Sequence, residues 1–355
     1  MKKRFSLRYK LILIFGLLVA MASFVEGALA VRTARKAVTE KVETHLIDKA
    51  TYTTNLIDAR VTAFFQFFEG IARTPILRDP TVSYREKAAF LKKEAAFNAR
   101  IHKMDLCDMK GTRYTDSGQT VDVSDRDFFI AASKGKNFVA EPLVSRLDGA
   151  FILAFTVPIY DDNHTIIGVL LASVEASALS HDIEDIIVGQ TGYCYILGLT
   201  GTTIAAKDFA RVKAMENVIK MAETDKSLAS LAAFEKMARE IDEPSISFYT
   251  YKGIHKIASY ATMKTTDWKI VINAPQEEFM GTVNSLRFSM IGIGLAILLI
   301  AFITVYIVAR AIVKPIQKVV SALQNIAQGD GDLTVRLPVH GNDEITDMAE
   351  YFNET

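Results

Sequence analysis

The sequence predicts an α+β membrane protein in which two apolar helices enclose a large region of strands and helices. Half of the 355 residues are hydrophobic, although acidic and basic side chains are also frequent and equal in number. The uncharged residues gather in two long runs, and the segment between them mixes alternating strand patterns with helical spacing. A net charge of zero gives no support to nucleic-acid binding, which favours a basic surface.

Two runs without charged residues are long enough to cross a membrane. The first occupies residues 11–31 if Glu26 lies near the interface, and the second occupies residues 288–309. At about 1.5 Å per residue, about 20 helical residues reach roughly 30 Å, the thickness of a hydrocarbon core. A cleaved signal peptide ending near Ala28 to Ala30 is the alternative for the first run, but its length favours a retained anchor.

Basic residues next to these spans predict the orientation of the chain. Such residues precede the first span and follow the second, which places residues 1–10 and 310–355 in the cytoplasm and residues 32–287 outside. The basic residues are Lys2, Lys3, Arg4, Arg8, Lys10, Arg310, Lys314 and Lys318. Cys107 and Cys194 then lie outside, where disulfides are permitted. Because they are far apart in sequence and fall in different modules, we expect both to be free and packed.

A long amphipathic helix is expected directly after the first span. Apolar residues recur every three or four positions from residue 38 to residue 71, and Pro75 and Pro80 stop the pattern. About 40 helical residues make a rod of roughly 60 Å. A rod of this length has more apolar surface than one small domain can cover, so it suits a helix beside two stacked modules or a second subunit.

Two antiparallel-sheet modules are expected between this helix and the second span. The distal module covers about residues 75–187 and the proximal module about residues 188–275. In each, a strand hairpin is followed by a helix and then by further strands, which we interpret as an approximate structural repeat. Ser124 or Asp125 is expected to cap the short helix of the distal module. In the proximal module a charged helix is expected over about residues 210–241.

The segment after the second span contains two short helices with narrow apolar stripes. The first stripe has heptad spacing over residues 312–326, and the glycines within residues 329–331 end that helix. Acidic Glu344 opens the second helix at its positive end. Neither stripe can be buried within one chain, so we expect a parallel four-helix bundle from two chains, a homodimer. Pro315 lies where the membrane helix joins this segment and would loosen the joint. The alternative is a membrane-proximal hairpin of no special role.

The sequence from the proline after the span through "GDGDLTVRL" to the "DEI" of the second helix resembles a HAMP domain. With "DRDFF", "GQTGYCYIL" and "DWKIVINAP" between two spans, nearly the whole chain resembles the double Cache sensor of methyl-accepting chemotaxis receptors. The resemblance implies PAS-like modules and a multi-pass protein of the bacterial inner membrane whose sensor is periplasmic or extracellular. We therefore expect a transmembrane chemoreceptor for a small ligand, with Pro315 and Glu344 in signal transmission through the HAMP domain.

The chain ends at Thr355, so we expect it to be truncated before the cytoplasmic signalling coiled coil, through which a chemotaxis kinase and adaptor would bind. The alternatives are the sensor half of a membrane histidine kinase or cyclic-dinucleotide enzyme, and a short regulatory sensor without its own output. We expect no catalytic activity, no cofactor and no metal. The six histidines lack metal-ligand spacing, and the sequence has no nucleophile elbow and no phosphate-binding glycine loop.

The resemblance also implies a ligand site in the distal module. In the amino-acid-binding receptors of this family, an arginine holds the ligand carboxylate bidentately and two aromatic residues follow it. Arg126, Phe128 and Phe129 match this part of the pattern, and one of the two phenylalanines is expected in the core. Arg146 is a further candidate for the pocket lining. The alternative for Arg126 is a surface ion pair with one of its neighbouring aspartates, which contributes little to stability.

The part of the pattern that holds the ligand's ammonium group is replaced in this chain. The amino-acid-binding receptors have a tyrosine five residues before the arginine, a tyrosine and an aspartate on the next strand, and an aspartate on the last strand. In this chain these positions are occupied by Val121, by Leu143 and Ser145, and by Ser173. We expect Ser145 and Ser173 to be ligand-binding residues. An ammonium group in a partly dry pocket needs a compensating negative charge or good acceptors. We therefore expect that the ligand is not a standard α-amino acid. A carboxylate or another polar small molecule without a primary amine fits better.

Overall fold

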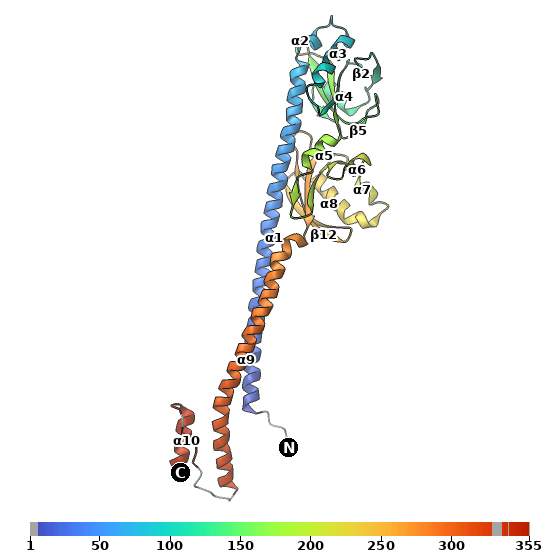
Figure 1. Cartoon of the computed structure of the whole chain (residues 1–355). Coiled ribbons are helices and arrows are strands. Elements are labelled where there is room, and N and C mark those ends of the chain that lie inside the picture. Colours follow the sequence, from blue (N-terminus) through green and yellow to red (C-terminus); the bar gives the residue numbers. More distant parts are fainter. Residues whose placement is uncertain (1–5, 329–335, 340, 355) are drawn as a thin grey trace. The chain divides into compact units, whose positions relative to one another are not determined.

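The predicted α+β class is confirmed, with a long first helix and two antiparallel sheets. The computed structural model describes residues 6–328, 336–339 and 341–354 (Figure 1). The chain divides into two compact units, one formed by residues 39–279 and the other by the two ends of the chain. Helices α1 (Leu7–Ala72) and α9 (Glu277–Ala327) contribute residues to both units.

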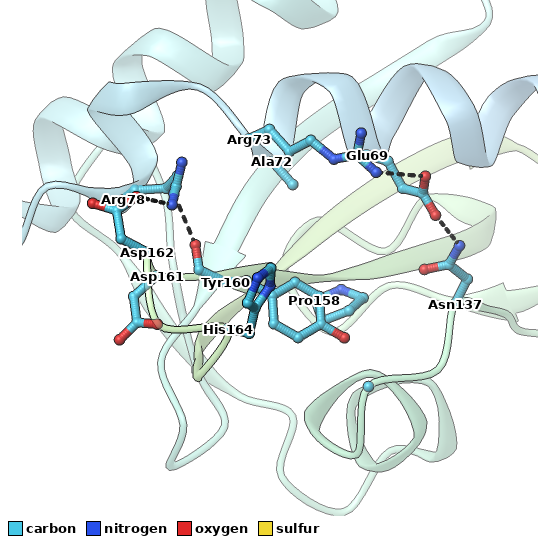
Figure 2. Close-up of a pocket in the computed structure, with 11 residues that line it drawn as sticks. Glu69, Ala72, Arg73, Arg78, Asn137, Pro158, Tyr160, Asp161, Asp162 and His164 are labelled. Carbon is cyan, nitrogen blue, oxygen red and sulfur yellow. Dashed lines mark hydrogen bonds and ion pairs between the residues drawn. The ribbon is translucent and has the colours of Figure 1, made fainter.

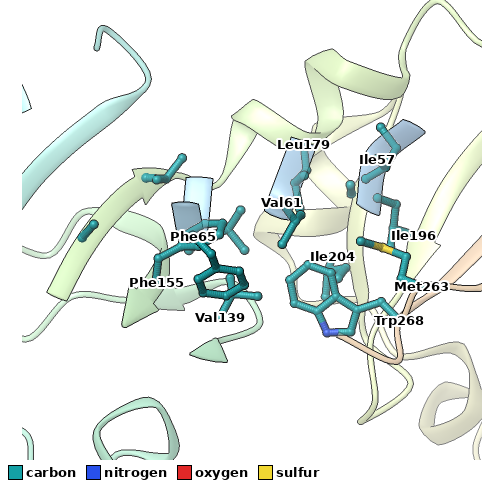
Figure 3. Packing of buried hydrophobic residues seen from close by; sticks show 14 of the residues in the cluster. Ile57, Val61, Phe65, Val139, Phe155, Leu179, Ile196, Ile204, Met263 and Trp268 are labelled. Carbon is teal, nitrogen blue, oxygen red and sulfur yellow. The ribbon is translucent and has the colours of Figure 1, made fainter. Parts of the chain in front are cut away.

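Helix α1 packs against both sheets of the unit formed by residues 39–279. The first apolar run and the predicted amphipathic helix are parts of this one helix, which ends at Ala72, shortly before Pro75 begins the next helix. Phe65 packs against Phe155 of the distal sheet, with ring centroids 5.4 Å apart. Further along α1, the backbone carbonyl of Leu46 accepts a hydrogen bond of 2.6 Å from Ser259 Oγ of the proximal sheet. Figure 3 shows the apolar layer in which side chains from α1 and both sheets meet.

The distal module follows α1 and is built around one antiparallel sheet. Its elements are α2 (Pro75–Arg78), α3 (Tyr84–Ala95), β1 (Ile101–Cys107), β2 (Thr112–Tyr114), β3 (Thr120–Asp122), α4 (Asp127–Ser133), β4 (Phe138–Val139), β5 (Leu143–Val144), β6 (Phe151–Tyr160) and β7 (Ile166–Glu175). The strand order is β3-β2-β1-β7-β6-β4, and β5 pairs with β6. Side chains alternate between faces, so Leu170 and Ala172 join the apolar cluster of α1, whereas Val169 and Leu171 join that of α4.

The proximal module has the same general plan. Its elements are α5 (Ser177–Ile183), β8 (Ile187–Val188), β9 (Gly192–Leu197), β10 (Thr203–Ala206), α6 (Phe209–Lys213), α7 (Val218–Met221), the 3₁₀ helix η1 (Lys226–Leu228), α8 (Ala229–Glu240), β11 (Ser245–Tyr251), β12 (Ile254–Thr262) and β13 (Lys269–Pro275). The strand order is β10-β9-β13-β12-β11, and β8 pairs with β9. Helix α8 covers the sheet face opposite α1, where Phe234 stacks on Tyr249 with ring centroids 5.0 Å apart.

The predicted charged helix over residues 210–241 was wrong, because this segment is divided into four short helical pieces. Side-chain caps mark the start of three of these pieces. Asp208 accepts a hydrogen bond from a backbone amide at the start of α6, Asn217 does so at the start of α7, and Asp225 at the start of η1. Residues of this kind stabilise helix starts more than helix interiors.

The predicted cap of the short distal helix was also wrong. Helix α4 begins after Arg126, whose side chain makes no capping hydrogen bond. Asp125 is not available as a cap because its carboxylate forms an ion pair with Arg146. The backbone amide of Ser124 donates to Asp122, so this residue belongs to the turn before the helix.

Both cysteines are free and buried, as expected from the sequence. Cys107 lies at the end of β1 and Cys194 lies within β9. Burial raises the pKa of the Cys107 thiol to about 12 and also raises the pKa of Cys194. Because the thiolate is the reactive form, both side chains are chemically inert in the folded protein.

The unit formed by the chain ends contains two helices long and apolar enough to cross a membrane, α1 and α9. Pro315 lies inside α9, which continues to Ala327. Two predictions concern residues outside the described part of the chain. They are the orientation signal of Lys2, Lys3 and Arg4 and the helix end at residues 329–331.

The last helix, α10 (Glu344–Glu354), packs on the end of α9 through a small apolar cluster. Val319 of α9, Leu337 of the connector and Ala349 of α10 form this cluster. Asn353 fixes the connector, because its side chain accepts from the backbone amide of Leu337 at 2.7 Å and donates to the Leu337 carbonyl at 2.9 Å. Glu344 is the first residue of α10, next to Asp343.

Helix α8 of the proximal module carries a buried carboxyl group on the side that faces the sheet. Glu235 is fully buried, and its Oε1 accepts a hydrogen bond of 3.1 Å from the Tyr195 hydroxyl. Its Oε2 has no hydrogen-bond partner among the described residues. Burial raises the pKa of Glu235 to about 7, so this side chain holds its proton at pH values where an exposed glutamate is ionised.

We expect the free energy of unfolding of residues 39–279 to fall as the pH rises from about 5 to about 8. The folded state binds the Glu235 proton more tightly than the unfolded state, so raising the pH favours unfolding. A rise of the Glu235 pKa from 4.5 in the unfolded state to about 7 in the folded state corresponds to roughly 3 kcal/mol of unfolding free energy. Urea unfolding at several pH values should show a smaller slope for Glu235→Gln, which stays neutral. The exposed Glu240→Gln at the end of the same helix is the control, and an unchanged slope for Glu235→Gln would contradict the prediction.

Candidate functional site

Four of the predicted ligand-binding residues line one cavity in the distal module. Arg126 precedes α4, Phe128 lies in its first turn, and Ser145 and Arg146 follow β5. The remaining lining comes from β2, β5, β6 and β7 and from the turn before α4, and consists of Arg113, Val123, Leu143, Ile152, Ala154 and Leu171. This small cavity has a free volume of about 10 Å³. That is room for about one water molecule.

The other two predicted residues lie close to this small cavity but do not line it. Phe129 is buried in the same apolar cluster as Phe128, so both phenylalanines are core residues rather than one. Ser173 lies on β7 two positions after Leu171 and is 1% exposed. Its hydroxyl oxygen is buried and has no hydrogen-bond partner among the described residues.

A buried ion pair at this cavity was missed by the sequence analysis. Arg113 donates from Nε and Nη2 to Asp105 Oδ2, at 2.9 and 2.5 Å, and both side chains are at most 5% exposed. Burial raises the pKa of Asp105, and the nearby Arg113 opposes that rise. The available signal was one charged residue on each strand of the β1–β2 hairpin. Arg113 of β2 lies opposite Cys107 of β1, and Asp105 lies two positions before Cys107 and therefore on the same face of the sheet.

A second arginine of the lining is also paired. Arg146 donates to both oxygens of Asp125 at 2.7 Å and to the backbone carbonyl of Asp122 at 3.1 Å. The hydrogen bonds from Arg146 lower the pKa of Asp125 to about 2. The ion pair with a neighbouring aspartate, which was the alternative for Arg126, is therefore made by Arg146 instead.

Arg126 is left without a partner of opposite charge in hydrogen-bonding contact. Its guanidinium makes no hydrogen bond and no ion pair with any residue that the structure describes, although it lies near enough to Asp125 to influence that carboxylate. Asp148, a further carboxylate of the same region, accepts from His102 and Lys103 at 2.9 Å each. The described lining thus contains three arginines and no acidic residue, and only Arg126 among the three is unpaired.

A larger cleft of about 370 Å³ lies on the other side of Arg126, between the distal and proximal modules. Arg126, Phe128 and Leu143 border both this cleft and the small cavity. The proximal module contributes Thr200, Asp267 and Trp268 to the lining of this cleft, and the distal module also contributes the carboxylates of Asp127 and Glu141. Arg126 can therefore be approached by a solute from the cleft.

Another cavity of the distal module, of about 550 Å³, contains none of the predicted residues (Figure 2). Glu69 at the end of α1 accepts from Asn137 at 2.6 Å and lies 3.5 Å from Arg73. Arg78 donates to the backbone carbonyl of Tyr160 at 3.0 Å and forms an ion pair with Asp162. Both arginines of this cavity are paired with carboxylates, and Asp161 is a third carboxylate in the lining (Figure 2), so the cavity offers a weaker reason to bind an anion than the cavity at Arg126.

Comparison with known proteins identifies a Cache domain and a HAMP domain, which together cover most of the chain. The model of the Cache domain family matches residues 30–283, and the model of the HAMP domain matches residues 307–355. Methyl-accepting chemotaxis protein TlpA of Bacillus subtilis is 28% identical over 244 residues, which are 68% of this chain and 33% of that protein. McpP of Pseudomonas putida is 48% identical over 65 residues, which are 18% of this chain and 12% of that protein. The chain thus spans about a third or less of the length of these curated relatives.

Solved sensor domains have the same fold. The ligand-binding domain of chemoreceptor CtaA from Pseudomonas fluorescens, in complex with L-isoleucine, has a TM-score of 0.54 and 16% identity, and the match covers 70% of this chain and 99% of that chain. An extracellular domain assigned to a histidine kinase, mmHK1S-Z3, has a TM-score of 0.55 and 14% identity, covering 71% and 99%. The chain belongs to the Cache domain family and carries a HAMP domain that begins within α9.

Proposed function

We propose that this chain is the sensing and relay part of a transmembrane chemoreceptor in the bacterial inner membrane. Residues 32–287 lie outside the cytoplasm, and the HAMP domain lies inside. The order of helix, Cache domain, helix and HAMP domain supports this assignment, as does the similarity to chemotaxis proteins. A homodimer would cover the apolar stripes of the HAMP helices, because a HAMP bundle needs four helices.

The proposed ligand is a small anion, a carboxylate in the first instance, that binds at Arg126. The observation that carries this proposal is the unpaired guanidinium of Arg126, which borders both the small cavity and the larger cleft from which a carboxylate would reach it. The described lining of the small cavity has three arginines and no acidic residue. A carboxylate can accept two parallel hydrogen bonds from one guanidinium. Such a ligand would compensate the one charge at the cavity that lacks a partner.

The same cavity is poorly suited to an ammonium group. The carboxylates nearest to the lining, Asp105 and Asp125, are already paired with arginines. Ser173 supplies a hydroxyl without charge, and the burial of an unpaired ammonium group is costly. CtaA was solved with L-isoleucine, whereas we propose a ligand without a primary amine for this chain.

The proposed relay is a population shift in which the ligand favours one arrangement of the distal module. Helix displacements of about 1–2 Å would then pass along α9, and Pro315 and the first turn of α10 at Glu344 would convert them into a change of HAMP packing. A histidine kinase is the second candidate for the complete protein, favoured by the likeness to mmHK1S-Z3. Fusion of the chain to the signalling region of a chemotaxis receptor tests the first candidate, since ligand should then change the activity of the chemotaxis kinase.

Arg126→Ala should weaken binding of the best carboxylate by roughly 10- to 100-fold, because a hydrogen bond to a charged group contributes about 1.5–3 kcal/mol. The ligand would be found by screening small carboxylates for a rise in melting temperature, and its affinity measured by calorimetry. Lys134→Ala removes an exposed cation at the other end of α4 and is the matched control. Equal affinity in the wild type and Arg126→Ala would exclude this site.

Ser173→Asp should allow the distal module to bind α-amino acids that the wild type does not bind. The substitution adds a carboxylate beside the cavity, at the position where the amino-acid-binding receptors have one. Ser173→Asn adds similar volume without charge and should not have this effect. Calorimetry with a panel of common amino acids measures both variants. Tight binding of several amino acids by the wild type would contradict the proposed ligand class.

The thiol introduced by Phe97→Cys should react with a membrane-impermeant maleimide in intact cells, whereas the thiol of Gln324→Cys should react only after the membrane is permeabilised. Phe97 is 82% exposed on the distal module and Gln324 is exposed near the end of α9. Cys107 and Cys194 are buried, so the unmodified chain is a low-background control for both variants. The reverse pattern of labelling would overturn the proposed orientation.

A further inference from the structure

Strand β9 of the proximal module is flanked by two turns, and each turn binds a carboxylate from a different element. One carboxylate belongs to Glu141 of the distal module and the other to Glu278 in the first turn of α9. We refer to β9 with both turns, residues 189–201, as the β9 segment.

The turn after β9 holds Glu141. The backbone amide of Thr200 donates to Glu141 Oε1 at 3.0 Å, and the Thr200 hydroxyl donates to Oε2 at 2.5 Å. Gly198 makes this approach possible, because a Cβ at that position would overlap the Glu141 carboxylate. Glu141 lies two residues before Leu143, which borders both the small cavity and the cleft at Arg126.

The turn before β9 holds Glu278. The backbone amides of Gln190 and Thr191 donate to its carboxylate at 2.6 and 3.1 Å, and the Thr191 hydroxyl also donates to it. Burial alone would raise the pKa of Glu278, but these hydrogen bonds lower it below its ordinary value. Gly189 has a φ of 65°, and a Cβ there would overlap the carboxylate.

The strand between these turns is well supported. The six residues of β9 span roughly 20 Å at about 3.3 Å per residue. They pair with β13 from Leu197 to Tyr193, and Asn273 of β13 donates from its side chain to the Tyr193 carbonyl at 3.1 Å. A strand held in the middle of a sheet moves as one body more readily than it bends, so a displacement at one turn reaches the other.

We propose that the β9 segment couples the cavity of the distal module to α9, with Glu141 and Glu278 as the positioning residues at its two ends. This inference rests on the proposed function, in which a ligand shifts the distal module. Movement of the Leu143 loop on ligand binding displaces Glu141, the β9 segment follows, and Glu278 transfers the displacement to the first turn of α9. Coupling of this kind is reciprocal, so a change at either carboxylate alters the other turn.

Hydrogen–deuterium exchange of the full chain in lipid nanodiscs tests the coupling without a ligand. The amides of Gln190, Thr191 and Thr200 donate directly to the two carboxylates, so their exchange reports on each turn. Glu141→Gln should speed exchange at Gln190 and Thr191 by about tenfold, and Glu278→Gln should do the same at Thr200. Exposed Glu184→Gln and Glu277→Gln are the matched controls and should leave both turns unchanged.

The inference is overturned if each variant affects only its own turn while its melting temperature stays within a few degrees of the wild type. If either variant unfolds, Thr200→Val and Thr191→Val serve instead, since each removes one hydroxyl and keeps the carboxylate. The proposed ligand site at Arg126 and the proposed coupling through the β9 segment can be rejected independently of each other. Coupled turns without any carboxylate binding at Arg126 would reject the proposed ligand site, and carboxylate binding with independent turns would reject the β9 segment as the route.

Discussion

The apolar face of α1 is the constraint on which the rest of the sensor depends. Phe65, Phe68 and Leu46 lie along one helix but pack against different sheets, and they belong to a single apolar cluster. Burial of a large apolar side chain contributes about 1.5–3 kcal/mol, so neither sheet can leave α1 without a large loss of stability. Helix α1 therefore supports both modules, while the opposite face of each sheet has an apolar cluster of its own that lies beside polar and charged side chains.

The difference between the two faces of the distal sheet explains why charged side chains occur at the candidate site. The sheet face away from α1 carries Asp105, Arg113 and Ser173, which an apolar core would not tolerate unless most of them were paired. Pairing removes Arg113 and Arg146 as ligand anchors and leaves Arg126. If the proposed ligand site is used, specificity would follow from a difference in free-energy cost, because an anion gains a partner at this cavity and a cation meets an excess of its own charge.

Much of the fold could be predicted from the sequence because its signals are local. The three- and four-residue spacing of α1 and the strand alternation of residues such as Leu170 and Leu171 are visible in the chain itself. The division of residues 210–241 was missed because helical composition concealed the caps at Asn217 and Asp225. At the site, Arg126 was expected from the motif, but its freedom from Asp125 depends on Arg146. Pairings of that kind are set by three-dimensional register and not by local pattern.

The contacts that escaped prediction join positions that no periodicity relates. The Asp105–Arg113 pair exists because the β1–β2 hairpin places Cys107 opposite Arg113. The hydrogen bonds that Glu141 and Glu278 accept join elements that are 59 and 87 or 88 positions apart in the chain. The glycines at both turns, Gly189 and Gly198, were nevertheless a signal that another group approaches the backbone closely.

The two free thiols have a consequence for the surroundings in which the sensor can work. Cys107 and Cys194 are enclosed within separate sheets, so dissolved oxygen and mild oxidants find no accessible thiol to attack, and no covalent bridge is available to break. The shape of the sensor is therefore independent of thiol–disulfide chemistry in the medium. A domain of this kind can keep the same fold in oxidising and in reducing media.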